Sequence, residues 1–194
     1  MKLRILLAVL TLLTCGGLVS YIFWQQELKY TLPTPVPASY VPVFFKENIH
    51  LPKAQTAPVF IHFFNPDCPC SRFNRKHVNE LIFQYKDKIN FKVVIPSYAS
   101  MEEAKSFFDE DIEIISDTEG WAEACGVYST PQAVIIDQES KLYFRGNYNR
   151  TRYCTDPKTN YAELALQSYA KNKPLPLMDE LAKRAYGCSF ADLN

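Results

Sequence analysis

Residues 63–73 read Phe63-Phe64-Asn65-Pro66-Asp67-Cys68-Pro69-Cys70-Ser71-Arg72-Phe73, with two cysteines at their centre. The run that leads into them, residues 59–64, is short, β-branched and aromatic, which predicts a buried strand. Apolar residues then recur at helical spacing as far as Tyr85, which predicts a helix. Cys68 therefore stands where a strand ends and a helix begins. Unpaired N–H groups at a helix start favour a thiolate, so the stretch predicts reactive thiol chemistry.

The rest of the chain alternates strand-like and helix-like segments. Strands are expected at residues 91–95, 112–115, 132–136 and 142–145, and the last two should form a hairpin around residues 137–140. Helices are expected at residues 101–108, 119–125 and 161–171, the second of them ending at Gly126. This order predicts an α/β domain with a mixed sheet covered by helices on both faces.

The order of these elements and the later Ser129-Thr130-Pro131 resemble a thioredoxin fold with its proline loop, from about residue 59 to residue 166. Residues 160–189 resemble the tail of redoxins, a group related to peroxiredoxins. The resemblance implies a thioredoxin-like mixed β-sheet with helices on both faces. It also implies a cis peptide before Pro131, beside the reactive cysteines, where the preceding backbone can pair with an extended substrate.

The resemblance gives Cys68 the role of nucleophile and Cys70 that of resolving thiol, with a disulfide between them after attack on a substrate disulfide. The expected catalytic residues are thus Cys68, Cys70 and Pro131. Only one residue separates the two cysteines, so the ring they close is small and the bond should be easily reduced. If that ring cannot close, a distant thiol would resolve Cys68 instead.

The remaining cysteines leave several pairings open. Cys154 and Cys188 fit a structural bridge between the loop after the hairpin and the tail. Alternatively, one of them is a resolving or relay thiol that reaches Cys68, or both stay unpaired. Cys125 lies at the end of an apolar helix and fits a buried structural thiol. Cys15 lies within an apolar segment and fits a thiol inside a membrane.

Two other functions compete with thiol–disulfide exchange. The first is a thiol peroxidase of redoxin type. Peroxiredoxins carry a Pro-x-x-x-Thr/Ser-x-x-Cys pattern, but here Ile61 stands at the proline position and Asn65 at the hydroxyl position. Arg145 would supply a cation to such a site only if the fold brings it close. The motif therefore argues against this alternative.

The second competing function is non-enzymatic copper handling, because two close thiolates suit Cu(I), as in thioredoxin-like copper chaperones. Those proteins space their cysteines more widely and add a histidine. His62 and His77 are the nearby histidines, and each fits a core or rim position better than a ligand. No metal or other cofactor is expected for the exchange reaction. A binding module with an inactive cysteine pair is the remaining alternative, and its thiols would not exchange.

The composition fits one globular domain with room for a membrane segment. The chain has 194 residues, 47% of them apolar, and its 21 basic residues balance 21 acidic ones. This balance does not favour a nucleic-acid partner. The expected partners are protein or small-molecule thiols and disulfides.

Residues 5–24 carry no charge and are long enough to span a bilayer as a helix. Lys2 and Arg4 precede them and favour a cytoplasmic amino terminus, which places the domain on the extracytoplasmic (periplasmic or equivalent) side. A cleaved signal peptide is the competing interpretation, with a weak cleavage site at residues 18–20. We expect an anchor at residues 1–30, a proline-rich stalk at 31–58 and the thioredoxin-like domain at 59–194. Residues 41–45 fit an extra edge strand. The sequence thus predicts a single-pass, membrane-anchored thiol–disulfide oxidoreductase.

Overall fold

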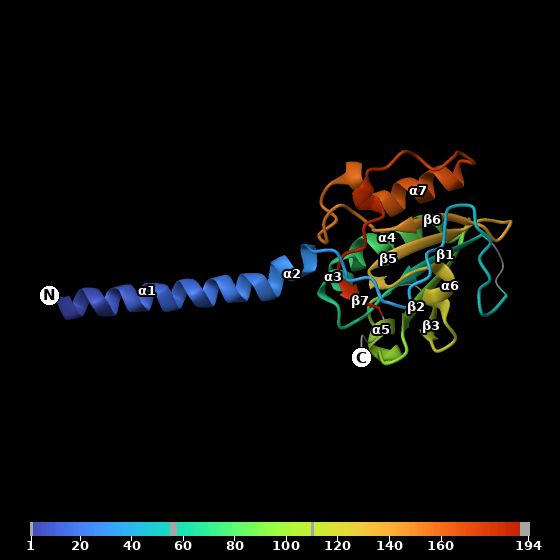
Figure 1. Cartoon of the computed structure of the whole chain (residues 1–194). Helices are drawn as coiled ribbons and strands as arrows, with labels where there is room; N and C mark the ends of the chain where they lie inside the picture. The colour runs from blue at the N-terminus through green and yellow to red at the C-terminus, as the bar shows by residue number, and fades with distance from the viewer. Residues whose placement is uncertain (1, 55–57, 110, 191–194) are drawn as a thin grey trace. The chain divides into compact units, whose positions relative to one another are not determined.

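The computed structural model describes residues 2–54, 58–109 and 111–190, which fall into two compact units divided between Leu32 and Pro33 (Figure 1). The first unit is helical throughout: α1 (Lys2–Phe23), the π-helix η1 (Trp24–Leu28) and α2 (Lys29–Thr31). None of its described side chains is buried, and the helix Lys2–Thr31 is long enough and contains a stretch apolar enough to cross a membrane, by length and composition. The expected candidate transmembrane helix is therefore confirmed.

The second unit is built on a five-stranded sheet. Its strands are β1 (Val59–Phe63), β2 (Asn90–Pro96), β3 (Glu113–Asp117), β5 (Gln132–Ile136) and β6 (Leu142–Gly146), in the order β3-β2-β1-β5-β6. The first three are parallel, whereas β5 and β6 are antiparallel to their neighbours. The expected hairpin and mixed sheet are confirmed, with β1 in the central position.

Helices cover both faces of this sheet (Figure 1). Apolar residues of α4 (Arg75–Tyr85) and α7 (Tyr161–Ala170) pack on one face, and Ala104 of α5 (Met101–Lys105) packs beside Val93 of β2. The short α6 (Trp121–Cys125) packs on the opposite face. Together with the strand order, this confirms a thioredoxin-like fold.

The position of β1 explains why its sequence is almost entirely apolar. Phe60 packs in the cluster under α4 and α7, whereas Ile61 and Phe63 pack in the cluster under α6. A strand buried on both faces shows a continuous apolar run rather than alternation. This strand delivers the chain directly to the cysteine stretch, so the core of the domain fixes where that stretch lies.

The helix expected through residue 85 is divided in two. A short α3 (Pro69–Phe73) precedes α4, and Asn74 separates them. The helices expected at residues 101–108 and 119–125 are confirmed but shorter, as α5 and α6. Two 3-10 turns were not predicted, η2 (Pro157–Thr159) and η3 (Glu180–Ala182), because single turns carry no periodic pattern.

A second, two-stranded sheet was not predicted. Strand β4 (Ser129–Thr130) pairs antiparallel with β7 (Cys188–Ser189). We call residues 185–190 the tail segment. Its other side meets the start of the stalk, where Pro33 bridges Tyr186 and the Thr34 amide donates to the Ala185 carbonyl at 3.0 Å. The tail segment therefore lies between the stalk and β4.

The stalk contacts the domain, but not as expected. Residues 41–45 form no strand, although Val43 packs against the apolar cluster under α6. Pairing occurs further along: the Lys46 amide donates to the Leu142 carbonyl, and Asn48 bridges Lys141. The edge-strand prediction at residues 41–45 was wrong. Pairing with β6 begins only at Lys46, where the left-handed backbone (φ 67°) turns the chain. Residues 55–57 of the expected stalk lie outside the described residues.

Candidate active site

Cys68 is the residue that precedes the first helical turn of α3. Its backbone is extended (φ −85°, ψ 119°), its amide donates to the Asn65 carbonyl at 3.0 Å, and its carbonyl accepts from the Arg72 amide at 3.1 Å. Pro69 follows at the start of the helix, where its missing N–H leaves no donor unsatisfied. The turn therefore holds Cys68 at the end of the loop from β1, as the sequence predicted.

The proline loop lies beside this cysteine. The peptide between Thr130 and Pro131 is cis, as the resemblance implied. The Cys68 sulfur lies 3.7 Å from the Thr130 carbonyl oxygen. In the reduced state a thiol at this place is within reach of that carbonyl as a donor. The structure thus brings Cys68 and Pro131 together at one edge of the domain.

Cys68 forms a disulfide with Cys188 of the tail segment. The two sulfurs are 2.10 Å apart, the Cα atoms are 6.0 Å apart, and 120 residues separate the cysteines in sequence. In the register of the small sheet Cys188 stands opposite Thr130, so the pairing of β7 with β4 carries it to Cys68. The expectation that one of the distant cysteines reaches Cys68 is confirmed for Cys188.

The expected bridge between Cys154 and Cys188 was therefore wrong, because the backbone pairing of the tail commits Cys188 to Cys68. Cys154 lies elsewhere, against the junction of α3 and α4, where its thiol donates to Oδ1 of Asn74. Burial raises the pKa of Cys154 to about 12. A thiol with so high a pKa is a poor nucleophile at neutral pH.

Cys70 is a fully buried thiol inside α3. The expected bond from Cys68 to Cys70 is not the bond present, since the tail segment supplies the partner of Cys68. A role of Cys70 as a second resolving thiol stays a prediction.

The reactive sulfur is shielded from solvent in the disulfide-bonded state. Cys68 is only 1% exposed. A sulfur has to be accessible before a thiolate can attack it. Part of the chain around Cys68 must therefore move before an external molecule can reach it.

Two cations, Arg72 and Arg75, follow Cys68 within two helical turns, where an unpaired guanidinium would add positive potential. Arg72 instead forms an ion pair with Glu103 at 3.3 Å and donates to the Pro66 carbonyl, and Arg75 forms an ion pair with Asp109 at 3.5 Å. Both pairs are solvent-exposed, and such pairs contribute little to stability. Each cation lies beside an anion, which reduces its contribution to the potential at the site.

The histidines that copper handling would need are part of the domain interior. His62 is buried on β1, and its Nδ1 shares a hydrogen bond of 2.8 Å with the Tyr148 hydroxyl. Burial lowers the pKa of His62 from 6.5 to about 3, and it also lowers the pKa of His77. Both are core or rim histidines, as expected. Among the described residues no group of three or more His, Cys, Asp or Glu side chains is arranged to hold a metal ion.

The buried His62 predicts acid destabilisation of the domain. Its folded-state pKa lies below its ordinary value, so the unfolded chain takes up the proton first as the pH falls. The stability from neutral His62 is therefore present above pH 6.5 and is lost toward pH 3. We expect a loss of about 2 kcal/mol in the free energy of unfolding between pH 7.5 and pH 5, measured by urea denaturation.

The variant H62Q should flatten this dependence, leaving a smaller slope from His77, whose pKa shifts in the same direction. The exposed His50 is the matched control, and H50Q should keep the full slope. An equal slope in H62Q and the unaltered chain would contradict the assignment.

Arg145 and Cys125 form a separate contact on β6 and α6. The Arg145 Nη1 donates to the Cys125 carbonyl at 3.2 Å. Cys125 is fully buried, and burial raises the pKa of its thiol. Cys125 is thus a buried structural thiol, as expected, and it serves below as a control.

Sequence reasoning missed the pairing of β4 with β7, and with it the backbone that holds Cys188 in place. Both strands have two residues, too few for a periodic pattern. One sequence signal was present: Gly187 precedes the cysteine, and a glycine often marks close approach of two backbones. A Cβ atom at residue 187 would lie 2.2 Å from the Thr130 carbonyl oxygen.

Comparison with protein families gives a match that spans residues 42–190. The matching family is described as a domain of unknown function, DUF6436. The chain belongs to the DUF6436 family. The family domain thus includes the stalk from residue 42, the whole sheet and the tail segment with Cys188. No curated protein sequence matches the chain.

Solved structures share the fold of this DUF6436 domain. An uncharacterized conserved protein from Geobacillus kaustophilus aligns with a TM-score of 0.59 and 23% identity, over 70% of this chain and 77% of that one. A hypothetical protein from Sinorhizobium meliloti aligns with a TM-score of 0.61 and 14% identity, over 78% and 96% of the two chains. At these identities the likeness concerns the fold alone.

Proposed function

We propose that this DUF6436 domain catalyses thiol–disulfide exchange through Cys68, with Cys188 as its partner in the oxidised form. The observation that carries the proposal is the Cys68–Cys188 bond, which lies beside the cis peptide before Pro131. Cys68 immediately precedes α3, and its sulfur lies against the Thr130 carbonyl. Its partner Cys188 belongs to the tail segment, of which only two residues pair with β4. Such a partner can leave and return while the five-stranded sheet stays intact.

The exchange needs no cofactor. In one direction a substrate thiolate attacks Sγ of Cys68, forms a mixed disulfide, and displaces Cys188 as a thiolate that takes a proton from water. In the other direction the Cys68 thiolate attacks a substrate disulfide, forms a mixed disulfide with one substrate sulfur and releases the other as a thiolate. The Cys188 thiolate then attacks Sγ of Cys68, closes the Cys68–Cys188 bond and releases the second substrate sulfur as a thiolate. Cys70 is the second candidate for this resolving step.

We further propose that residues 5–24 anchor the protein in a membrane and that the domain lies on the extracytoplasmic side. The apolar helix and the preceding Lys2 and Arg4 support this orientation. A disulfide persists most readily in an oxidising compartment, which fits the same placement. The substrates would then be protein or small-molecule thiols and disulfides near that membrane.

The test is mass-mapped thiol trapping of the full chain in detergent micelles, across a series of glutathione redox buffers. As the buffers become more oxidising, we expect the alkylation of Cys68 and of Cys188 to fall together. On reduction the alkylation of both cysteines should rise together. Cys125 should stay unmodified in folded protein and be alkylated equally at every potential after denaturation. A Cys68 that forms no reversible bond would contradict the proposal.

A further inference from the structure

The tail segment is bound to β4 as an extended peptide. Ser189 stands opposite Ser129, Cys188 stands opposite Thr130, and the Phe190 amide donates to the Tyr128 carbonyl at 2.9 Å. Three consecutive residues of the tail are thus held by backbone contacts, two of them by β4 and the third by Tyr128, which precedes β4. Backbone pairing of this kind supplies affinity for any extended chain, and pockets for side chains supply specificity.

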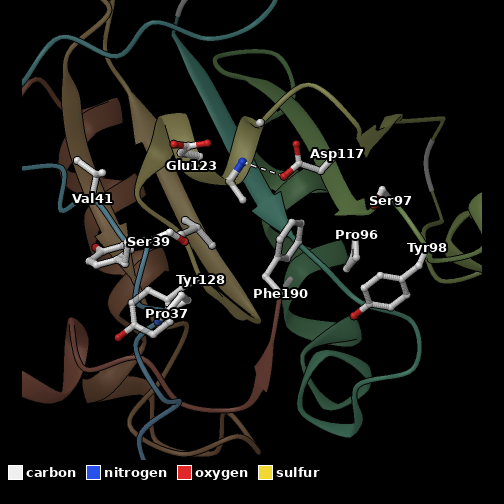
Figure 2. Close-up of a pocket in the computed structure, with 14 residues that line it drawn as sticks. Pro37, Ser39, Val41, Pro96, Ser97, Tyr98, Asp117, Glu123, Tyr128 and Phe190 are labelled. Carbon is white, nitrogen blue, oxygen red and sulfur yellow. Dashed lines mark hydrogen bonds between the residues drawn. The ribbon is translucent and has the colours of Figure 1, made fainter. Parts of the chain in front are cut away.

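The side chain that follows the cysteine by two residues has such a pocket. Phe190 is 3% exposed, and its ring centroid lies 5.4 Å from that of Phe63 in an edge-on contact. It also lines a cavity of about 420 Å³ (Figure 2). Tyr128 lies on one side of Phe190 in that view, and Pro96 and Tyr98 lie on the other. The site that Phe190 fills therefore accommodates an aromatic ring against Phe63, and the cavity is further space beside it.

The acidic groups around this cavity do not compete with an aromatic occupant. The Asp117 carboxylate accepts hydrogen bonds from the amides of Trp121 and Ala122, at 2.6 and 3.0 Å, so it is engaged with the start of α6. Glu123 is exposed at the margin.

The residue before the cysteine has a restriction of its own. Gly187 has φ 107° and passes so close to β4 that a Cβ would meet the Thr130 carbonyl. A chain that follows the path of the tail segment therefore needs glycine immediately before its cysteine. The pattern accommodated here is glycine, cysteine, any residue, aromatic residue.

We propose that β4 and the cavity beside Phe190 form a binding site for extended polypeptides that carry Gly-Cys-x-aromatic, and that the tail segment is its built-in occupant. This inference rests on the proposed exchange at Cys68 and adds the class of substrate. A client strand replaces the tail on β4, places its cysteine against Cys68, and inserts its aromatic side chain where Phe190 lies.

The chemical step is balanced within the two chains. With the Cys68–Cys188 bond open, the Cys68 thiolate attacks the sulfur of a client cysteine that is already in a disulfide, and an S–S bond forms between the client and Cys68. The client's own disulfide breaks, and its electron pair leaves on the second sulfur of that disulfide, which takes a proton from water. No outside oxidant is required, because one disulfide replaces another.

The test uses the full chain in detergent micelles with C15S and C188S, so that Cys68 is unbonded and the anchor thiol is absent. The probe is the peptide Ala-Tyr-Gly-Cys-Ser-Phe, which copies the tail segment, with its cysteine activated as a mixed disulfide with thionitrobenzoate. Attack by Cys68 forms the peptide disulfide and releases the coloured thiolate. Two control peptides replace the phenylalanine by alanine or exchange the positions of serine and phenylalanine.

We expect the probe to react at least about tenfold faster than either control peptide, from the apolar burial of one aromatic side chain. Equal rates for the three peptides would overturn the peptide site while leaving exchange at Cys68 standing. Release that stays at the level of a C68S chain for every peptide would instead overturn the proposed exchange. The two failures are therefore distinguishable.

A change in the tail provides an independent readout. In the same C15S and C188S chain, F190A should raise the rate with the probe severalfold, because the competing tail then holds β4 less tightly. The glycine requirement is checked with Ala-Tyr-Ala-Cys-Ser-Phe, which should react more slowly than the probe. A rate that F190A leaves unchanged would overturn the claim that the tail competes with the peptide for β4, whatever stability the loss of the buried Phe190 costs the domain.

Discussion

Replacing Cys68 by serine is expected to reduce thiol–disulfide exchange by about a thousandfold or more, to the rate of the uncatalysed reaction. The hydroxyl of serine cannot form the mixed disulfide, and Cys188, which this change frees from its bond, has no partner left with which to complete the exchange. Cys70, Cys125 and Cys154 are buried in whole or in part, and burial raises the pKa of the last two. The measurement is the rate of disulfide reduction in a glutathione-coupled assay with full-length protein.

The matched control is C125S, which removes the buried thiol at the end of α6. This change should leave the exchange rate near that of the unaltered chain. C188S should separate attack from resolution, because Cys68 still attacks but mixed disulfides accumulate. Accumulation with C70S rather than with C188S would assign the resolving role to Cys70. Full activity in C68S would remove Cys68 from the mechanism.

Replacing Gly187 by alanine is expected to release the tail segment from β4. The new Cβ would lie 2.2 Å from the Thr130 carbonyl oxygen, and a residue with φ 107° is strained with any side chain. A destabilisation of about 2 kcal/mol is typical of such strain and corresponds to a factor of about 30. We expect the equilibrium constant for the Cys68–Cys188 bond in glutathione buffer to fall by that factor.

Gly120 offers a control with similar strain and no close contact. Its φ is 84°, but the nearest atom to a new Cβ there is the Glu123 carboxylate oxygen at 3.9 Å. G120A should therefore lower the stability of the domain while leaving the Cys68–Cys188 equilibrium unchanged. Equal effects of G187A and G120A on that equilibrium would show that contact with Thr130 does not matter.

The sequence was sufficient to predict the sheet, its helices and the placement of Cys68. These rest on local patterns, since β1 is apolar except for His62 and α4 repeats its buried residues at helical spacing. The cis peptide before Pro131 was also correctly anticipated, but through resemblance rather than through periodicity. Such features depend on neighbours in sequence, so a single chain contains enough information to recognise them.

The partner of Cys68 could not be chosen from sequence, because cysteine pairing depends on long-range contacts. Cys154 and Cys188 were equivalent candidates by composition. They differ only because the tail segment pairs with β4, whereas Cys154 contacts Asn74. The edge strand at residues 41–45 failed for a related reason, since pairing with β6 begins where the chain turns at Lys46.

Because 120 residues separate the bonded cysteines, the conformational entropy of the unfolded chain depends strongly on whether the disulfide is closed or open. A cross-link that closes a loop of this length removes unfolded-state freedom equivalent to about 5 kcal/mol in the chain-entropy model. Opening the bond returns that freedom to the unfolded ensemble. The form of the domain that accepts a client is therefore also its less stable form, and how long it survives depends on how soon the bond closes again.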